Sequence, residues 1–434
     1  MNIVLVTNTF TSHVGGVARS VEAFSEEYRR LGHRVLVIAP EFPDTPEDEV
    51  DVIRVPAIQK FNASDFSVAL PIPSGLIEAL QDFRPDVIHS QHPFLLGMTA
   101  VRLARYFELP LVFTHHTLYE QYTHYVPGNS TLLQNFIIEL GTSYANLSDQ
   151  VFAPSDSIGE LLLKRGVTTP VAVVPTGVRT ERFACGQGEL CRQRLGIPAS
   201  AFVVGHMGRL APEKNLRFLA QAVIRFLQHR EETVFLLVGS GSMEDELKQD
   251  FAEAGVQDRV FMAGVLQSQE LADALAAMDV FVFASQSETQ GMVLTEAMAA
   301  GTPVVAVDAS GAREVVRDGV SGRLLQHEDL ASYVEALNWV HDLSEGERAQ
   351  LVAGARAVAE EYSLANTAQQ ALACYEALCP QDPHQWEGDE QRWKQVMRFI
   401  GAEWEVLKSI SSAGDDAINA YLLESDKEES DKEE

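Results

Sequence analysis

The sequence contains little cysteine and few basic residues. Four cysteines among 434 residues are too few for a disulfide scaffold. We place Cys185 and Cys191 in a loop and Cys374 and Cys379 on a helix, and neither pair has the two-residue gap common in zinc sites, so no metal site is expected. Lys and Arg number 33 against 62 Asp and Glu, a net charge of −29. This balance argues against a nucleic-acid-binding protein, although a nucleotide needs only a few local donors.

The chain also has no long uncharged apolar run and no basic segment at its amino terminus. No run reaches the ~18 residues that a membrane-spanning helix needs. Residues Met1–Val6 pass directly into an apolar run with no preceding basic region, so no signal peptide is expected. We therefore expect a cytoplasmic protein with reduced cysteines.

Apolar runs and segments of helical spacing alternate along most of the chain. Residues 2–6 and 35–39 are continuous apolar runs, and the segment between them has apolar residues at helical spacing up to Gly32. Runs of the same kind lie at 87–88, 111–113, 151–153 and 171–174. Strands so continuously apolar are buried on both faces, which is typical of a parallel sheet covered by helices.

The alternation is interrupted at residues 176–200, which contain Gly186, Gly188 and Pro198, and then restarts at 202–206. Later runs lie at 234–238, 260–262, 280–283 and 303–307. We predict an α/β protein with two Rossmann-like, doubly wound parallel-sheet domains, 1–178 and 179–362, that face an interdomain cleft. Beyond them we predict a helical extension at 381–424 and a disordered acidic tail at 425–434, where Ser-Asp-Lys-Glu-Glu occurs twice.

The first candidate for chemistry is the segment Gly-Arg-Leu-Ala-Pro-Glu-Lys-Asn at 208–215. It follows the first apolar run of the second domain and opens a helix. Arg209 and Lys214, beside the amide groups of a helix start, suit a diphosphate. The alternative is that both are solvated surface cations.

The second candidate lies at 288–296 and follows the apolar run 280–283. Gly291 permits close approach of the backbone, and a helix is predicted to start near Met292. Glu296 then lies one turn along the same helix face, where its carboxylate can accept hydrogen bonds from ribose hydroxyls. Glu288 is placed to meet a second set of hydroxyls. The alternatives are a helix-surface charge for Glu296 and a charge favoured by the helix dipole for Glu288.

The glycine turn at 238–241 is weak evidence by itself, because such turns often serve only to reverse the chain. It is not a complete Gly-x-Gly-x-x-Gly, and no Walker lysine pattern is present. The sequence therefore disfavours dinucleotide and P-loop sites, and with them a dehydrogenase.

Several motifs together resemble the retaining glycosyltransferases of family four, which have the GT-B fold. They are the 208–215 segment, the Glu288/Glu296 pair, Ala-Met-Ala-Ala-Gly-Thr-Pro-Val-Val after Glu296, and Gly-Ala-Arg-Glu-Val-Val-Arg-Asp-Gly from Gly311. In the first half, Asn-Thr-Phe at 8–10 with Gly15 and Gly16, and Phe-Thr-His-His-Thr at 113–117, are similar to the family's glycine loop and to its active-site histidine segment. The resemblance runs from residue 1 to about residue 380.

The resemblance implies a nucleotide-sugar-binding second domain, an acceptor-binding first domain and a helix at 363–380 that returns to the first domain. It implies that Arg209 and Lys214 hold the donor diphosphate, that Glu296 binds the ribose and that Glu288 binds the transferred hexose. The remaining donor contacts that it implies are Gly15, Gly16, Gly264, Val265, Gln290, Gly291, Met292 and Val293.

The resemblance also implies a metal-independent hexosyltransferase that retains the anomeric configuration and needs no cofactor besides its nucleoside-diphosphate sugar, for which we expect UDP-glucose. Breaking the sugar–phosphate bond leaves negative charge on the diphosphate, which Arg209, Lys214 and the helix dipole would stabilise. His116 would lie near the sugar at the reaction centre. The leaving phosphate oxygen would accept the acceptor's proton, so no protein nucleophile is assigned.

The aromatic segment after His116 and the segment 90–94 resemble those of bacterial diacylglycerol glucosyltransferases. This similarity implies a lipid acceptor, peripheral membrane contact at the inner face of the membrane, and acceptor contacts at His92, Tyr119, Glu120 and Tyr125. Against strong attraction to anionic lipid, residues 1–185 carry 13 Lys+Arg and 20 Asp+Glu, a net charge of −7. A soluble small-molecule or saccharide acceptor, a sugar-nucleotide epimerase and a non-catalytic sugar-nucleotide-binding protein remain as alternatives.

Overall fold

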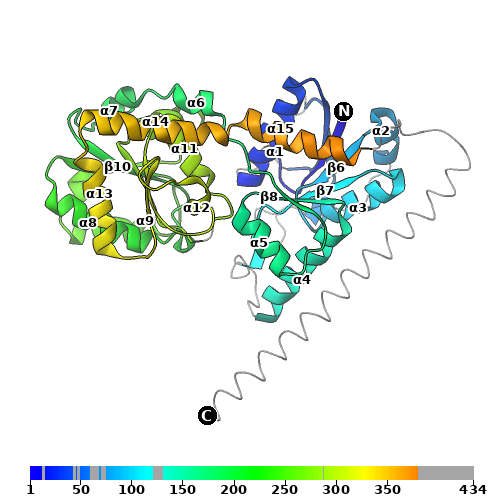
Figure 1. Ribbon diagram of the computed structural model, residues 1–434, viewed down its shortest axis with the longest axis horizontal. Coiled ribbons are helices and arrows are strands. Elements are labelled where there is room, and N and C mark those ends of the chain that lie inside the picture. Colours follow the sequence, from blue (N-terminus) through cyan, green and yellow to red (C-terminus); the bar gives the residue numbers. More distant parts are fainter. Residues whose placement is uncertain are drawn as a thin grey trace, which may run out of the picture. The chain divides into compact units, whose positions relative to one another are not determined.

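A computed structural model describes residues 1–11, 15–42, 45, 49–58, 68–69, 75–120, 131–286 and 288–379. The chain forms two compact units (Figure 1). The first comprises Met1–Pro175 and the chain from Thr367 onward, and the second comprises Thr176–Asn366. The sequence analysis put these changes of domain at 178/179 and 362/363. The predicted helical extension and acidic tail lie outside the described residues.

The first unit is built on a parallel sheet of seven strands in the order β3-β2-β1-β6-β7-β8-β9. Its strands are β1 (Asn2–Val6), β2 (Arg34–Pro40), β3 (Val52–Val55), β6 (Val87–Ser90), β7 (Leu111–Thr114), β8 (Gln150–Ala153) and β9 (Val171–Val173). Its helices are α1 (Gly16–Arg30), α2 (Leu76–Phe83), α3 (Leu96–Phe107), α4 (Thr131–Leu147), α5 (Asp156–Lys164) and α15 (Leu364–Leu378), of which the last begins in the second unit. A short antiparallel pair joins β4 (Ala57–Ile58) to β5 (Val68–Ala69).

The second unit contains a parallel sheet of six strands in the order β12-β11-β10-β13-β14-β15. Its strands are β10 (Phe202–Met207), β11 (Thr233–Val238), β12 (Val260–Gly264), β13 (Val280–Phe283), β14 (Val304–Val307) and β15 (Gly322–Leu325). Its helices are α6 (Thr180–Ala184), α7 (Gly188–Leu195), α8 (Leu216–His229), α9 (Glu244–Glu253), α10 (Ser268–Ala276), α11 (Met292–Ala300), α12 (Ala312–Val315), α13 (Leu330–His341) and α14 (Glu345–Glu361). Two single 3₁₀ turns span Pro212–Lys214 and Gln257–Arg259.

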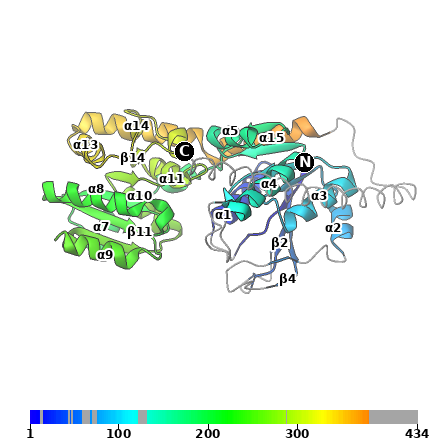
Figure 2. The ribbon, with the colours of Figure 1, turned by 90° about the horizontal axis from the view of Figure 1, so that it is seen from below.

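Helices cover both faces of each sheet (Figure 2), which explains why the strands are apolar throughout rather than alternating. In the first unit α2 to α5 cover one face, and α1 and α15 cover the other. In the second unit α8, α9 and α13 pack on one face, and the remaining helices pack on the other. The predicted fold class, two doubly wound parallel sheets, is therefore confirmed.

The structure corrects the sequence analysis in several places. Residues 176–200 were expected to be irregular but contain α6 and α7, and Cys191 lies in α7 rather than in a loop. The short strands β3 and β15 were not predicted, and Cys379 lies just past the end of α15. Among the described residues, no helix is both long enough and apolar enough to cross a membrane.

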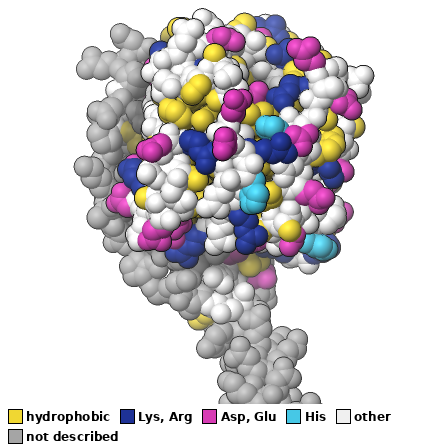
Figure 3. Space-filling model, turned by 90° about the vertical axis from the view of Figure 1, so that its left-hand side faces the viewer, with side chains coloured by type: hydrophobic (Ala, Val, Ile, Leu, Met, Phe, Trp, Pro, Cys, Tyr) yellow, Lys and Arg dark blue, Asp and Glu magenta, His cyan; other side chains and the backbone are white. Residues whose placement is uncertain are grey.

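Charged side chains are interspersed on the face of the second unit that Figure 3 shows. Acidic and basic groups are mixed there, with apolar side chains scattered among them. Within the second unit, Arg217 pairs with Glu246 and Lys248 pairs with Glu244. The negative net charge is thus not gathered into one patch on this face.

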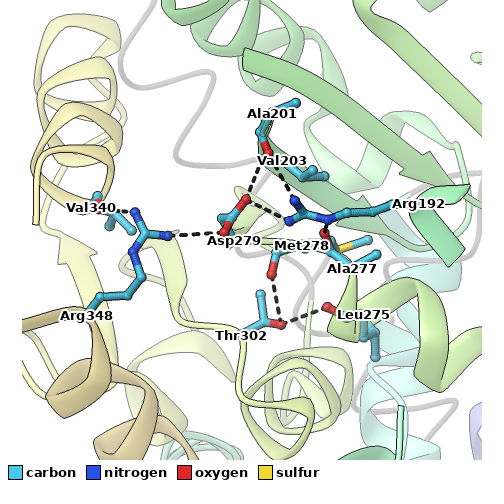
Figure 4. Close-up of polar contacts among 10 residues, drawn as sticks. All are labelled: Arg192, Ala201, Val203, Leu275, Ala277, Met278, Asp279, Thr302, Val340 and Arg348. Carbon is cyan, nitrogen blue, oxygen red and sulfur yellow. Dashed lines mark hydrogen bonds and ion pairs between the residues drawn. The ribbon is translucent and has the colours of Figure 1, made fainter. Parts of the chain in front are cut away.

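Asp279, directly before β13, links three elements of the second unit (Figure 4). Its Oδ2 accepts hydrogen bonds from Nη2 of Arg192 at 2.8 Å and from the backbone N–H of Val203 at 2.7 Å. Its Oδ1 accepts one from Nη1 of Arg348 at 3.2 Å. The carboxylate therefore fixes α7 and α14 against the start of β10.

Replacing Asp279 with alanine is expected to destabilise the second unit by about 3 kcal/mol, because the half-buried Arg192 and the Val203 amide lose their acceptor. Urea unfolding followed by circular dichroism measures the change. Glu361→Ala is the matched control, since it removes a carboxylate whose ion pair with Arg317 is half exposed, and exposed pairs contribute about 1 kcal/mol or less. Equal losses in the two variants would contradict the structural role of Asp279.

Candidate functional site

The predicted donor-binding residues of the second unit gather at the carboxyl edge of its sheet. Strands β10 and β13 are parallel neighbours, so the segments that follow them leave from the same edge. Arg209 and Lys214 follow β10, and Glu288 follows β13. Open α/β sheets bind their ligands at this edge.

Lys214 and Glu288 form an ion pair between these two segments. Their side chains are only 17% and 22% exposed, so the pair is partly shielded from water. The cation predicted to bind diphosphate and the carboxylate predicted to bind the hexose are therefore in contact. Arg209, which is 49% exposed, pairs with Glu213 one turn along.

The turn that carries Lys214 is fixed to the neighbouring loops. Pro212 starts the turn, and Asn215 ends it in the left-handed conformation with φ 55°. Asn215 Nδ2 donates to the carbonyl of Ala284 at 3.3 Å and to Oε2 of Glu328 at 2.9 Å. These contacts fix the position of the Lys214 backbone before any ligand binds.

Helix α11 begins beside this pair. Gly291 precedes it with φ 71°, and a Cβ atom at Gly291 would lie 3.0 Å from the carbonyl oxygen of Gly311. The buried side chain of Gln290 accepts from the backbone N–H of Thr176 at 2.6 Å and donates to the carbonyl of Thr176 at 2.7 Å. The Gln290 side chain thus anchors the chain before α11, so the donor contact predicted at Gln290 falls to its backbone.

The remaining predicted donor contacts of this unit lie on α11 and after β12. Met292 and Val293 form the first turn of α11, and Glu296 lies one turn later and is half-buried. Gly264 ends β12 with φ 66°, and its carbonyl accepts from the N–H of Gly239 at 2.7 Å. Val265 after it is 60% exposed, which leaves an apolar side chain at the sheet edge where a donor contact was predicted.

The sequence analysis missed His206, the penultimate residue of β10. Its ring is buried, and its Nδ1 hydrogen-bonds to the carbonyl of Val282 at 2.9 Å, so Nδ1 carries the proton. Its Nε2 is buried without a hydrogen-bond partner. Burial, with a smaller contribution from the ammonium of Lys214, lowers the pKa of His206 to about 4, although the hydrogen bond to Val282 and the charge of Glu288 act in the opposite direction. A histidine inside an otherwise apolar strand was the available signal.

The predicted residues of the first unit also lie at the carboxyl edge of their sheet. His116 follows β7, and its Nε2 hydrogen-bonds to Oε1 of Gln91 after β6 at 2.7 Å. Burial lowers the pKa of His116 to about 3, with His115 adding a smaller effect of the same sign, so the ring is neutral near pH 7. Gly15 and Gly16 form the start of α1, and a Cβ atom at Gly16 would meet nothing within 4 Å.

The predicted acceptor residues have structural partners within this unit. Nδ1 of His92 accepts from the backbone N–H of Asn8 at 3.1 Å. The rings of Tyr119 and Phe94 meet edge to face with centroids 4.8 Å apart. Glu120 forms an ion pair with Arg165 at 2.7 Å. Tyr125 lies outside the described residues.

No group of three or more His, Cys, Asp or Glu side chains in the described part of the chain is arranged to hold a metal ion. The four cysteines are unpaired with one another.

Comparison with known proteins identifies the family. Residues 14–182 match the family described as Glycosyltransferase Family 4, and residues 189–358 match Glycosyl transferases group 1. The alpha-monoglucosyldiacylglycerol synthase of Streptococcus pneumoniae is 29% identical over 353 residues, which cover 80% of each protein. A GDP-mannose-dependent alpha-mannosyltransferase of Mycobacterium tuberculosis is 33% identical over 344 residues, covering 75% of this chain and 84% of the relative.

Solved structures share the fold. HepE of Anabaena, crystallised with UDP, has a TM-score of 0.69 at 22% identity and covers 87% of this chain and 100% of its own. Sucrose-phosphate synthase of Thermosynechococcus elongatus has a TM-score of 0.68 at 21% identity, with 87% and 99% covered. The chain matches the family descriptions in both of its halves, and it has the two parallel sheets with the motifs at their edges. It is therefore a glycosyltransferase and belongs to the GT-B enzymes of family 4.

Proposed function

We propose that this glycosyltransferase moves glucose from UDP-glucose to the hydroxyl group of diacylglycerol or a related glycolipid, with retention of anomeric configuration and without a metal ion. The observation that carries the proposal is the Lys214–Glu288 pair beside the start of α11. It sets a cation for a phosphate next to a carboxylate for sugar hydroxyls.

The chemistry follows from where charge develops. As the glycosidic bond breaks, the diphosphate gains negative charge and the anomeric carbon gains positive charge. Arg209, Lys214 and the amides at the start of α11 stabilise the first charge, because they are oriented before reaction. Glu288 and Glu296 accept hydrogen bonds from hexose and ribose hydroxyls and so fix the donor's orientation.

His116 contributes as a neutral group in this proposal. Its depressed pKa keeps the ring uncharged at pH 7, so it acts by hydrogen bonding to the sugar and not by repelling the developing cation. The acceptor hydroxyl attacks from the side on which the diphosphate departs, and the leaving phosphate oxygen takes the hydroxyl proton. The anomeric configuration is thereby retained without a covalent enzyme intermediate.

The lipid acceptor is supported by the Streptococcus relative and by a second alpha-monoglucosyldiacylglycerol synthase from Acholeplasma laidlawii, 26% identical over 338 residues. The same names support glucose as the transferred sugar, and UDP-glucose as donor is supported by the UDP-glucose complex of HepE, whose chain shares this fold. In this proposal the enzyme works at the cytoplasmic face of the membrane and meets the lipid through its first unit. The GDP-mannose-dependent relatives favour a second candidate, a mannosyltransferase.

The test is a donor-by-acceptor assay with mass detection of the product. UDP-glucose and GDP-mannose are each offered with diacylglycerol in mixed micelles and with soluble saccharides, in buffer containing EDTA. Hexosyl-diacylglycerol formed from UDP-glucose, with an α-anomeric proton in its NMR spectrum, is expected. Mannosylated product would select the second candidate, and nucleoside diphosphate release without any glycoside would overturn the transferase proposal.

A further inference from the structure

Two polar contacts link β6 and the residues just after it to β7 and the residues just after it, in the first unit. Nε2 of His89 lies 2.7 Å from Oγ1 of Thr114, and two residues further along both strands, Nε2 of His116 lies 2.7 Å from Oε1 of Gln91. Each contact joins residues 25 apart in sequence. They run from inside the sheet to the edge where His116 lies.

The inner of these two contacts, at His89, continues to α15, the last helix of the described chain. Nδ1 of His89 lies 2.5 Å from the hydroxyl of Tyr375 on α15, and that hydroxyl lies 3.2 Å from the hydroxyl of Tyr28 on α1. The Tyr375 ring stacks on Phe152 of β8, with centroids 5.8 Å apart and planes inclined by 21°. Tyr375 is 0% exposed and His89 is 5% exposed.

A histidine so enclosed has a fixed orientation. Burial, with a smaller contribution from the nearby His116, lowers the pKa of His89 to about 3, so the ring is neutral near pH 7. A neutral ring has one N–H donor and one acceptor nitrogen, and Thr114 and Tyr375 satisfy one each. A buried hydrogen bond lost here leaves a polar atom unpaired, which costs about 1–3 kcal/mol.

The contact at His116 defines its protonation. An amide oxygen can only accept, so Nε2 of His116 carries the proton and Nδ1 is the acceptor nitrogen. The direction of the imidazole therefore depends on Gln91 and on the relative offset of the ends of β6 and β7. The His89–Thr114 contact lies two residues closer to the interior and restrains that offset together with the backbone pairing of the two strands.

We propose that Thr114, His89 and Tyr375 are positioning residues for His116, through which α15 fixes the geometry of the reaction centre. The inference rests on the proposed function for the role of His116. None of the three residues touches substrate in this scheme. They act by holding β7 in register with β6, so that a shift of a few tenths of an ångström at His116 is prevented.

Two matched pairs of variants test this. Thr114→Val removes the hydroxyl at nearly constant volume, whereas Thr114→Ser keeps it. Tyr375→Phe removes the hydroxyl that contacts His89, whereas Tyr28→Phe removes only the hydroxyl that contacts Tyr375. We expect kcat to fall about tenfold in the first member of each pair and less than twofold in the second, with the Kd for UDP unchanged.

The melting temperature of each variant separates positioning from general loss of stability. Each variant is assayed at a temperature about 15 °C below the onset of its own unfolding. A tenfold fall in kcat at that temperature, with UDP binding intact, supports a positioning role. A kcat for Thr114→Val within twofold of wild type would overturn it, as would equal losses in Thr114→Ser and Thr114→Val.

A second readout does not depend on activity. In protein labelled with ¹⁵N-histidine, the signals of His116 are assigned by their absence in His116→Gln. They are expected to show an Nε2-protonated ring, to shift in Thr114→Val and Tyr375→Phe, and to stay in place in Tyr28→Phe. Unshifted signals in Thr114→Val would overturn the inference. A shift in a protein that transfers no sugar would refute the proposed function and leave the positioning role standing.

Discussion

Replacing Lys214 with alanine is expected to lower kcat by about 10²–10³-fold and to weaken UDP binding as well. A preorganised donor aimed at developing charge contributes about 3–4 kcal/mol to the transition state, and Lys214 is held in place by its turn and by Glu288. The same change leaves the carboxylate of Glu288 without its cation. Steady-state kinetics and calorimetric titration of UDP measure the two effects separately.

Arg209→Ala should have a smaller effect, because its guanidinium is about half exposed and water screens its field more strongly. The matched control is Lys248→Ala, which removes one positive charge from the exposed surface of α9 in the same unit. Its kcat should lie within twofold of wild type. Tight UDP binding that survived both Lys214→Ala and Arg209→Ala would refute the diphosphate assignment.

The fold could be predicted largely from the sequence, because the signal for a doubly covered parallel sheet is local. Runs such as 234–238 are apolar at every position, and β11 spans Thr233–Val238. Strand β15 was not predicted, because its sequence Gly-Arg-Leu-Leu is short and does not form a continuous apolar run; the strand is only partly buried. Helices α6 and α7 were not predicted, because the glycines at 186 and 188 indicate a loop. Close packing of the backbone requires these glycines, since a Cβ atom at Gly188 would lie 2.2 Å from the carbonyl oxygen of Ala276.

The sequence could propose residues for the candidate site, since each proposed residue follows an apolar run, but it could not give their partners. Lys214 and Glu288 are 74 residues apart, and Gln290 meets Thr176 across 114 residues. The strand order sets β10 beside β13 and so brings Lys214 near Glu288, whereas Thr176 precedes β10 and meets Gln290 through tertiary packing. The partnerless Nε2 of His206 and the series from Tyr375 to Thr114 depend on tertiary packing in the same way.

The two glutamates of the donor site should respond differently to substitution. Glu288→Ala is expected to lower kcat by about 10²-fold while changing the Kd for UDP by less than about threefold, because this carboxylate is assigned to the hexose, which UDP lacks. Glu296→Ala should weaken UDP binding and lower kcat/KM together, because the ribose is present in both UDP and UDP-glucose. Kinetics with UDP-glucose and calorimetry with UDP alone distinguish the two patterns.

Glu288→Gln sharpens the first test, since the amide keeps one acceptor oxygen for a sugar hydroxyl but no longer neutralises Lys214. If hydroxyl binding is its main role, glutamine should recover part of the kcat lost in the alanine variant. If charge balance with Lys214 dominates, glutamine should behave like alanine and UDP should bind more tightly, because Lys214 is then available to phosphate alone. Glu335→Ala on the exposed side of α13 is the control for removal of a carboxylate. Equal losses of UDP affinity in Glu288→Ala and Glu296→Ala would contradict the division between hexose and ribose.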